Sequence, residues 1–202
     1  MLQTQTVVPD LLELLKELMN ENLFSDFNLV GGTSLALQMG HRNSIDIDLF
    51  GDSEINPELF IEILTSFGDV TVTQSSKNIL ITKINDIKVD FVNYKYPLLN
   101  DYLVVDNIRM LSMKDIAAMK LNAIAGRGSK KDFVDLFFLL EEFSMEEILQ
   151  FYKQKYADGS LFMVQKSLTY FEDANPQLEP KMFKNFDWEI CKQKILEEVS
   201  KL

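Results

Sequence analysis

Cysteine and histidine are nearly absent from this chain, with only Cys191 and His41 among 202 residues. One cysteine cannot form an intrachain disulfide, and one Cys with one His cannot supply the four ligands of a structural zinc site. This cysteine usage fits a reducing compartment, so we expect a cytoplasmic protein. Without such cross-links the fold must rest on a hydrophobic core, which a chain of this length can provide.

Long hydrophobic runs are also missing from the sequence. No apolar stretch reaches the 18 or so residues that a membrane-spanning helix needs. The first residues, MLQTQTVVPDLLELLKELMN, lack a basic start, a compact apolar core and a small-residue cleavage site. We therefore expect neither a signal peptide nor a membrane partner.

Positive charge is scarce, since 20 Lys and Arg face 31 Asp and Glu and the formal net charge is −11. An acidic chain repels nucleic acid at long range, which argues against non-specific DNA binding. The exception is GRGSKKD at 126–132, where three cations lie within seven residues. One small basic site on an acidic body suits a small anionic ligand better than a long polyanion.

The first half of the chain mixes helical and extended patterns. Leucines at helical spacing after Pro9 predict a helix over residues 9–20. FNLVGG predicts a short strand, and TSLALQMG a helix with a hydroxyl N-cap, closed by Gly40. IDIDLF predicts a strand, and Asn56 followed by Pro57 predicts another helix. The runs VTVTQ, NILITKI and IKVDFVNY predict three strands, with a hairpin turn at Asn85-Asp86, and YLVVDN predicts one more.

The second half of the chain shows helical patterns only. The predicted helices cover Ser112–Ala125, Lys131–Phe143, Ser144–Tyr156, about Ser160–Phe171, and Asp187–Lys201. We place the boundary near Met110, with an α/β domain over residues 1–110 and a helical domain over residues 111–202. The expected fold class is α+β, a mixed sheet flanked by helices and followed by a C-terminal helical bundle.

Two carboxylates interrupt the apolar strand SIDIDLF, where Asp46 and Asp48 are one residue apart. Strand side chains alternate between faces, so both point the same way, about 6.6 Å apart along the strand. Ile45, Ile47 and Leu49 are then expected to face the core. Adjacent carboxylates repel, and a divalent cation such as Mg²⁺ relieves the repulsion. Taken alone, the D-x-D pattern is more typical of the exposed polar face of an edge strand.

A third carboxylate, Asp90, interrupts the strand IKVDFVN in the same manner. Three strand aspartates on one face could hold two metal ions, the arrangement that clamps attacking and leaving oxygens in phosphoryl chemistry. The segment Gly31-Gly32-Thr33-Ser34 precedes the first two aspartates and favours this interpretation. Its glycines allow the backbone to approach a phosphate, and a helix N-terminus supplies amides and a positive dipole.

The predicted helix IAAMKLNAIA places Lys120 among apolar residues. Either its stem covers apolar surface while the amine reaches water, or the amine binds a phosphate of a nucleotide. Asp135 lies on the apolar face of the next helix, so it is either a semi-buried partner of Lys120 or Arg127, or a second anion of the active site. Asp132 is consistent with a carboxylate favoured at a helix start.

The stretches that carry these residues resemble a known family. GGTSLALQMGHRNSIDIDLF is similar to the G-[GS]-[TS]…D-x-D signature of the nucleotidyltransferase superfamily, which has the polymerase-β-like fold, and more closely to the AbiEii/AbiGii-type toxin family. SMKDIAAMKLNAIAGRGSKKDFVDLFFLL resembles that family's second block, and the strand with Asp90 lies between the two. The resemblance covers about Leu29 to Leu140.

Together, the residues and the resemblance imply an enzyme that transfers a nucleoside monophosphate from an NTP to an acceptor hydroxyl, with Mg²⁺ or Mn²⁺ as cofactor. The expected metal ligands are Asp46, Asp48 and Asp90, and Asp90 also prepares the acceptor hydroxyl; His41 is the alternative base. The expected catalytic residues are Asp46, Asp48, Asp90, Lys120 and Asp135. The expected nucleotide-binding residues are Gly31, Gly32, Thr33, Ser34, Arg42, Lys120, Arg127 and Lys131.

The resemblance further implies a bacterial toxin of a type IV toxin–antitoxin or phage-defence pair, with tRNA as acceptor and a cognate antitoxin encoded nearby. The helical domain is expected to complete the active site. Two other classes remain open from the residues. One is a nucleotidyltransferase that modifies a small molecule or a protein hydroxyl, and the other is a nucleotide-binding regulator without catalysis.

Overall fold

The computed structural model describes the whole chain, residues 1–202, and divides it into two compact units. Unit 1 comprises Met1–Lys95 and Tyr102–Leu111, and unit 2 comprises Tyr96–Asp101 and Ser112–Leu202. Neither unit has a helix that is long and apolar enough to cross a membrane.

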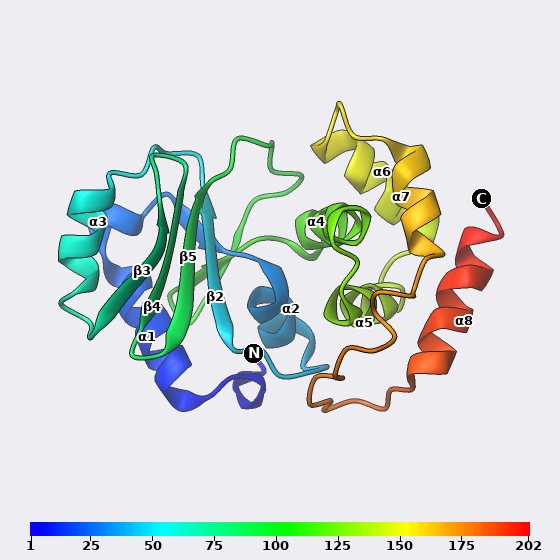
Figure 1. Cartoon of the computed structure of the whole chain (residues 1–202), viewed down its shortest axis with the longest axis horizontal. Helices are drawn as coiled ribbons and strands as arrows, with labels where there is room; N and C mark the ends of the chain where they lie inside the picture. Colours follow the sequence, from blue (N-terminus) through cyan, green and yellow to red (C-terminus); the bar gives the residue numbers. More distant parts are fainter. The chain divides into compact units, whose positions relative to one another are not determined.

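Unit 1 is built on a seven-stranded mixed sheet with the strand order β3-β4-β5-β2-β1-β7-β6 (Figure 1). The strands are β1 (Phe27–Leu29), β2 (Asp46–Gly51), β3 (Val70–Ser75), β4 (Ile79–Ile84), β5 (Ile87–Asn93), β6 (Leu103–Val105) and β7 (Ile108–Met110). The pairs β2–β5 and β1–β7 are parallel, and the other four pairs are antiparallel. The mixed sheet flanked by helices that the sequence predicts is therefore confirmed.

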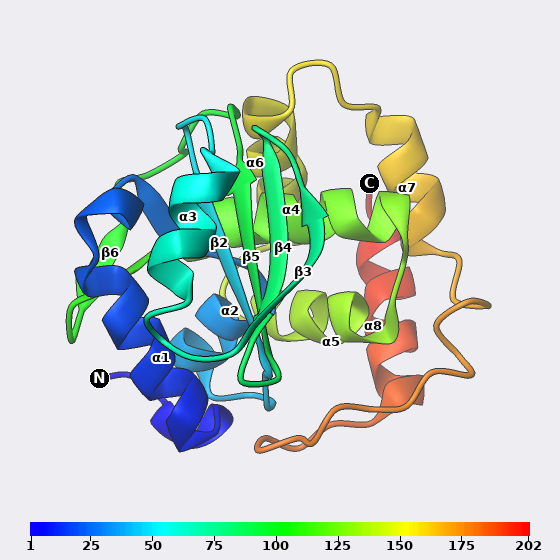
Figure 2. The same ribbon diagram turned by 60° about the vertical axis from the view of Figure 1, so that its left-hand side comes forward.

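Three α-helices flank this sheet, namely α1 (Pro9–Asn20), α2 (Gly31–Met39) and α3 (Pro57–Leu64). Single 3₁₀ turns at Thr4–Thr6 and Asn22–Phe24 flank α1. α1 and α3 lie on one face of the sheet and α2 on the other (Figure 1, Figure 2). The core lies under α1 and α3, where Phe24, Phe27, Phe60 and Phe91 pack with ring centroids 4.7 to 5.7 Å apart.

Several local predictions in unit 1 are confirmed. α1 has the predicted bounds, and the Asn56 side chain accepts a hydrogen bond from Leu59 N at the start of α3. The turn between β4 and β5 lies at Asn85-Asp86, and both residues have positive φ, 47° and 68°. Such angles are those of a type I′ hairpin turn, which suits the twist of the strands.

Three predictions in unit 1 are wrong. α2 begins at Gly31 rather than at the hydroxyl residues, its N-cap is Val30, and no side chain caps it. Ile45 is 53% exposed instead of facing the core, because β2 begins only at Asp46. The sequence patterns also missed β7, whose three residues are too few to show strand alternation.

Unit 2 is helical and contains α4 (Met113–Gly126), α5 (Lys130–Leu139), α6 (Met145–Lys155), α7 (Leu161–Leu168) and α8 (Trp188–Val199). α4 packs against α5, α6 and α7, while α8 packs against α5 and α7. Ser112, Ser144 and Asp187 cap α4, α6 and α8 with their side chains. All five predicted helices exist, but α5 ends at Leu139, four residues before the predicted end at Phe143.

A buried ion pair holds the segment Tyr96–Asp101 within unit 2. Lys155 Nζ lies 2.8 Å from Asp115 Oδ1 and donates to the carbonyl oxygen of Pro97 at 2.8 Å. The Asp115 carboxylate also accepts hydrogen bonds from the backbone N–H groups of Leu99 and Asn100 at 3.0 and 3.3 Å. Both charged side chains are fully buried, so these bonds satisfy charges that water cannot reach.

Candidate functional site

The polar residues of unit 1 gather on β2 and β5, the parallel pair at the centre of the sheet. In the register of this pair Asp46 lies opposite Lys88, and Asp48 lies opposite Asp90. Because strand side chains alternate between faces, these four residues share one face. The opposite face carries fully buried apolar residues of the same strands, Ile47, Leu49, Val89 and Phe91. The pairing thus brings together the three aspartates that the sequence predicts as metal ligands.

Lys88 is the site residue that sequence reasoning missed. Its ammonium forms a short ion pair with Asp90 Oδ2. Burial opposes the charged amine, but the hydrogen bond to Asp90 and the charges of Asp90, Asp48 and Asp46 outweigh it and raise the pKa of Lys88. The signal was available, because the alternation of IKVDFVN places Lys88 on the same face as Asp90.

The carboxylates of this face suit a divalent cation for two reasons. Their oxygens are the ligands that such a cation prefers, and one oxygen of Asp90 has no hydrogen-bond partner. Asp90 is only 9% exposed, and its Oδ1 is buried without a hydrogen-bond partner. A buried carboxylate oxygen without a partner is costly, and a cation would satisfy it. As the side chains lie, no three Asp, Glu, His or Cys residues form a closed ligand group. The register therefore supplies oxygen ligands of the kind that Mg²⁺ and Mn²⁺ prefer, and Lys88 lies among them.

The first turn of α2 lies against this carboxylate face. Val30 N donates to the carbonyl oxygen of Asp48 at 2.9 Å, which holds the start of α2 beside β2. Gly31 has φ +67°, and a Cβ atom there would lie 2.6 Å from Asp48 Oδ2. At Gly32 a Cβ atom would lie 2.5 Å from Arg42 Nη2. The two glycines therefore allow a carboxylate and a guanidinium to approach the helix backbone.

The hydroxyl residues of this turn face the protein interior. Thr33 and Ser34 are buried. Thr33 Oγ1 lies 2.8 Å from Ser44 Oγ and donates a short hydrogen bond to the carbonyl oxygen of Asp46. Ser34 Oγ accepts a hydrogen bond from Gln38 at 3.1 Å. Phosphate contacts from this segment would accordingly come from its backbone amides rather than from these hydroxyls.

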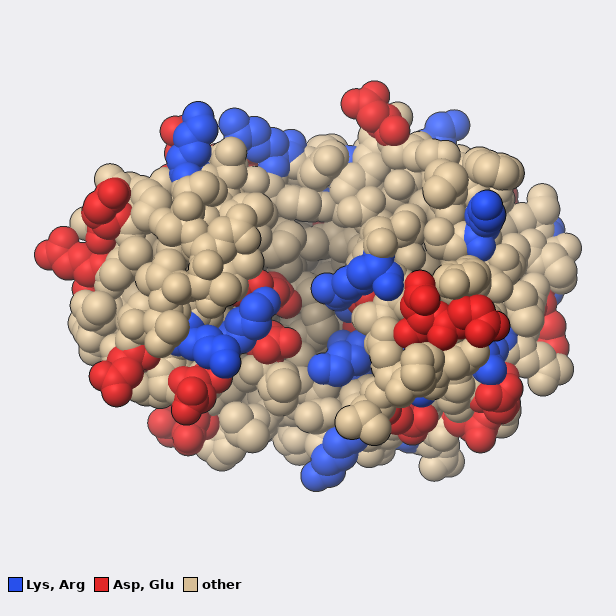
Figure 3. Space-filling view, in the orientation of Figure 1, with Lys and Arg blue, Asp and Glu red and all other residues tan.

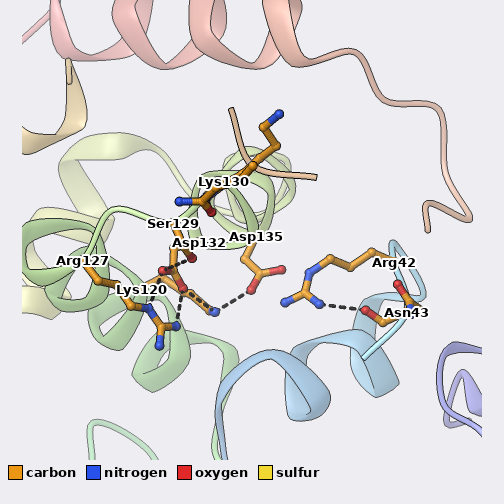
Figure 4. A network of polar contacts seen from close by, with 9 residues as sticks. Arg42, Asn43, Lys120, Arg127, Ser129, Lys130, Asp132 and Asp135 are labelled. Carbon is orange, nitrogen blue, oxygen red and sulfur yellow. Dashed lines mark hydrogen bonds and ion pairs between the residues drawn. The ribbon is translucent and has the colours of Figure 1, made fainter. Parts of the chain in front are cut away.

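Arg42 and His41 are both buried in the turn between α2 and β2. Arg42 is 2% exposed, and its Nη1 donates to the carbonyl oxygen of Asn43 at 2.8 Å (Figure 4). A guanidinium beside the positive end of a helix dipole favours an anion at that place. His41 is fully buried in unit 1.

The predicted polar residues of unit 2 form a second cluster around Asp132 (Figure 4). Lys120 Nζ lies 3.1 Å from Asp132 Oδ1 and 2.5 Å from Asp135 Oδ2. Arg127 Nε donates to Asp132 at 2.8 Å and Ser129 Oγ at 2.6 Å. Lys120 is thus neutralised by two buried carboxylates, and Asp135 is one of its partners.

Asp132 is the centre of this cluster, although the sequence suggested only a carboxylate at a helix start. Burial would raise the pKa of Asp132, but the charge of Lys120 and the hydrogen bonds of Arg127 and Ser129 outweigh it and lower that pKa to about 2. The carboxylate is therefore ionised at neutral pH. The only feature of the sequence that could have indicated this central role is that Asp132 follows Arg127 by five residues.

The two lysines of the basic turn differ in their surroundings. Lys130 is 7% exposed, donates to the carbonyl oxygen of Asn175 at 3.2 Å, and lies 5.1 Å from the centre of the Trp188 ring. Lys131 is exposed, and the Arg127 side chain is 69% exposed. Lys130 consequently stabilises unit 2, whereas Arg127 and Lys131 can meet a ligand from solvent.

Charges of both signs lie on the visible face of the space-filling view. On the face drawn in Figure 3, Lys and Arg side chains are interspersed with Asp and Glu on each unit and form no continuous basic surface. This distribution agrees with the net charge of −11. Of the basic residues discussed above, Arg127 and Lys131 are exposed, whereas Arg42 is buried in unit 1.

Comparisons with known proteins extend over nearly the whole chain. The model of the family described as "Nucleotidyl transferase AbiEii toxin, Type IV TA system" matches residues 13–198. The match reaches well beyond the quoted motifs of residues 29–140, because the later helices belong to the family but contain no short signature. The uncharacterized protein aq_aa25 of Aquifex aeolicus is 37% identical over 172 residues, which cover 82% of this chain and 84% of that one.

Two solved structures share the fold at low sequence identity. A Helicobacter pylori protein of known crystal structure superposes with a TM-score of 0.58 at 19% identity, covering 94% of this chain and 92% of its own. MenT4, a nucleotidyltransferase toxin of Mycobacterium tuberculosis H37Rv, superposes with a TM-score of 0.57 at 14% identity, covering 95% and 84%. Taken with the family match over residues 13–198, these findings show that the chain is a nucleotidyltransferase and belongs to the AbiEii toxin family.

Proposed function

We propose that this protein uses a divalent metal ion to transfer a nucleoside monophosphate from an NTP to an acceptor hydroxyl, with release of pyrophosphate. One observation carries the metal-dependent part of the proposal. Asp48 and Asp90 lie opposite each other on parallel strands, Asp46 shares their face, and the first turn of α2 adjoins Asp48. This arrangement combines oxygen ligands for a cation with backbone amides for a phosphate.

Asp46, Asp48 and Asp90 would hold the metal. A bound Mg²⁺ or Mn²⁺ would neutralise the charge of the triphosphate and lower the pKa of the acceptor hydroxyl. Asp90 is the residue that would also orient this hydroxyl and accept its proton, because its Oδ1 is buried and has no other partner. Its position on β5 opposite Asp48 keeps both functions on one sheet face.

The triphosphate would bind at the first turn of α2. The backbone amides there have no side-chain cap, and the buried guanidinium of Arg42 lies against Gly32. A positive helix end and a guanidinium both attract an anion, so together they would orient the triphosphate at this place.

Nucleotide binding by Lys120, Arg127 and Lys131, and a catalytic role of Lys120 and Asp135, remain proposals from the sequence. The exposure of Arg127 and Lys131 supports it. Lys120 is already paired with two carboxylates, so its role in binding would be to fix Asp132 and Asp135. By this proposal the helical unit takes part in the reaction through Arg127 and Lys131 directly.

We propose tRNA as the acceptor and a neighbouring gene product as the antitoxin. Membership of a family of type IV toxin–antitoxin systems supports the antitoxin, and the tRNA acceptor is proposed from the sequence resemblance. The acidic net charge means that tRNA would be recognised at a local site rather than by a broad basic surface. Toxicity on expression, and its relief when the neighbouring gene is expressed as well, would test the second part.

Transfer can be tested with α-³²P-labelled NTPs, total tRNA and purified protein, with Mg²⁺ or with excess chelator. We expect label on tRNA only with metal. Asp48→Asn should abolish transfer, and Asp52→Asn, an exposed carboxylate just beyond β2, should leave it intact. Label on the protein or on an added small molecule would replace tRNA as acceptor. Nucleotide binding without transfer to anything would contradict the catalytic proposal.

A further inference from the structure

We propose that Lys88 is an internal counter-ion that competes with the divalent metal for the carboxylates of β2 and β5. The inference rests on the proposed metal-binding role of Asp46, Asp48 and Asp90. It adds a residue that controls how tightly the metal is held. The sequence motifs of the family did not point to this lysine.

The geometry of the parallel pair carries the inference. Lys88 is directly opposite Asp46 and two residues from Asp90 on the same face. Paired Cα atoms of neighbouring strands are about 5 Å apart, so four charged side chains occupy a two-by-two array. Three of them are carboxylates, and Asp48 and Asp90 lie directly opposite each other, where like charges repel. A single ammonium in this array attracts all three.

The contact of the ammonium is with a proposed metal ligand. Lys88 Nζ binds Asp90 Oδ2, while Asp90 Oδ1 is buried and has no hydrogen-bond partner. The Lys88 amine therefore satisfies one of the two oxygens of the Asp90 carboxylate, and the Asp90 side chain is only 13% exposed. A metal ion bound by both oxygens, or by Oδ2 together with Asp48, would need the place of this ammonium.

The Lys88 side chain can also move its amine away from the carboxylates. Its side chain is 41% exposed, and a lysine has a flexible four-carbon stem that can carry its amine into solvent. On its other side β4 presents Lys83 as the cross-strand neighbour of Lys88. Two lysines opposite each other repel, which biases the Lys88 amine toward the carboxylates. The amine is thus attracted to the array but not locked into it.

This arrangement makes two roles of Lys88 separable by measurement. As a competitor, it weakens metal binding, because the metal must displace a cation. As a counter-ion, it stabilises the sheet when no metal is bound.

The test is a titration with Mn²⁺ in the absence of nucleotide, with free Mn²⁺ followed by electron paramagnetic resonance. We expect Lys88→Met to bind Mn²⁺ about tenfold more tightly than wild type, the scale of removing one nearby charge in a partly exposed site. Lys88→Arg keeps the charge and should bind Mn²⁺ as wild type does. Lys83→Met removes a charge from the exposed neighbour and should change the affinity much less.

Thermal unfolding provides a second readout on the same proteins. In chelator, Lys88→Met should melt about 2–4 °C below wild type, and added Mn²⁺ should raise its Tm by more than it raises that of wild type. If the methionine variant does not fold, Lys88→Gln serves for both measurements.

The outcomes separate this inference from the proposed function. Mn²⁺ binding that is equal or weaker in Lys88→Met than in wild type would overturn the inference and leave the metal site in place. A wild type and a Lys88→Met variant that both fail to bind Mn²⁺ would overturn the proposed metal dependence together with the inference. If Lys83→Met tightened Mn²⁺ binding as much as Lys88→Met does, the effect would reflect general surface charge, and the inference would be overturned.

Discussion

At the scale of single residues, Asp90 combines three properties that are rarely found together. It is nearly buried, one of its oxygens contacts Lys88, and the other oxygen has no partner. His41, the alternative base, is buried in the turn after α2. The free oxygen makes Asp90 the better candidate for the group that prepares the acceptor, because a base must reach the proton that it removes.

Asp90→Asn should therefore lower the single-turnover rate of transfer by a factor on the order of 10², the scale of losing a general base. Nucleotide binding should persist through α2 and Arg42. His41→Gln should retain most of the rate per folded molecule, and the pH–rate profile should show no break near the histidine pKa of about 6.5. Rapid-quench measurements across pH decide this, and an inactive His41→Gln beside an active Asp90→Asn would reverse the roles.

The lowered pKa of the Asp132 carboxyl predicts how the stability of the protein changes in acid. Its pKa of about 2 in the folded protein lies below the ordinary value of 3.8. A lowered pKa stabilises the fold above the unfolded value, and this contribution disappears as the pH falls from about 4 toward 2. We expect Asp132→Asn to lose roughly 2 kcal/mol at pH 7, with the difference from wild type narrowing only below about pH 4.

Urea unfolding between pH 7 and pH 3 measures this difference. Asp158→Asn, in the exposed loop between α6 and α7, is the matched control and should change stability little at any pH. A wild-type stability that grows relative to Asp132→Asn as the pH falls from 7 to 5 would contradict the predicted sign, because the folded pKa of Asp132 would then be raised rather than lowered.

At the scale of elements, the start of α2 depends on a backbone conformation that favours glycine. Gly31 has φ +67° and lies against Asp48 Oδ2, so Gly31→Ala would meet both strain and a clash. We expect a loss of about 1–3 kcal/mol in stability and a large loss of transfer. In contrast, a Cβ atom at Gly126, the last residue of α4, meets nothing within 4 Å.

Gly126→Ala is thus the control substitution, and it should be neutral or stabilise the protein by up to about 1 kcal/mol, since alanine favours helix. Melting curves and transfer assays on both variants make the comparison. Equal effects of the two substitutions would show that the close approach of Asp48 to the first turn of α2 has no consequence.

At the scale of the whole molecule, the chain passes between the two units three times, at residues 95–96, 101–102 and 111–112. The short segment Tyr96–Asp101 belongs to unit 2, although both of its sequence neighbours belong to unit 1. Asp115 and Lys155 hold it through buried hydrogen bonds. This ion pair accordingly ties the connection between the units to the helical unit.

Lys155→Met should lower the free energy of unfolding by about 3–5 kcal/mol, because Asp115 keeps its charge and loses its cation in a buried place. Lys153→Met, on the same helix but exposed, should be nearly neutral. Combining Lys155→Met with Asp115→Asn should recover part of the loss, which a double-mutant cycle in urea measures. A loss of less than 1 kcal/mol in Lys155→Met would show that the pair contributes little.

The sequence by itself determined the elements and the family. Leucine spacing, the Asn56 cap and the Asn85-Asp86 turn are local signals, and local signals predict helices, strands and turns without knowledge of the partners. The motif GGTS…DIDLF pointed to the nucleotidyltransferase fold, which the family match confirms. Strand alternation also predicted that Asp46 and Asp48 share a face, because side chains alternate along any strand.

Only the tertiary structure decided which charges meet. Asp46 lies opposite Lys88 in the strand register from 42 residues away, and Lys155 forms an ion pair with Asp115 from 40 residues away. The periodicity of one strand or helix indicates a face but not the residue across from it, since strand register and helix packing depend on the whole core. For the same reason Asp132 emerged as the centre of its cluster only once α5 lay beside α4, whereas strand alternation alone already places Lys88 on the face of Asp90.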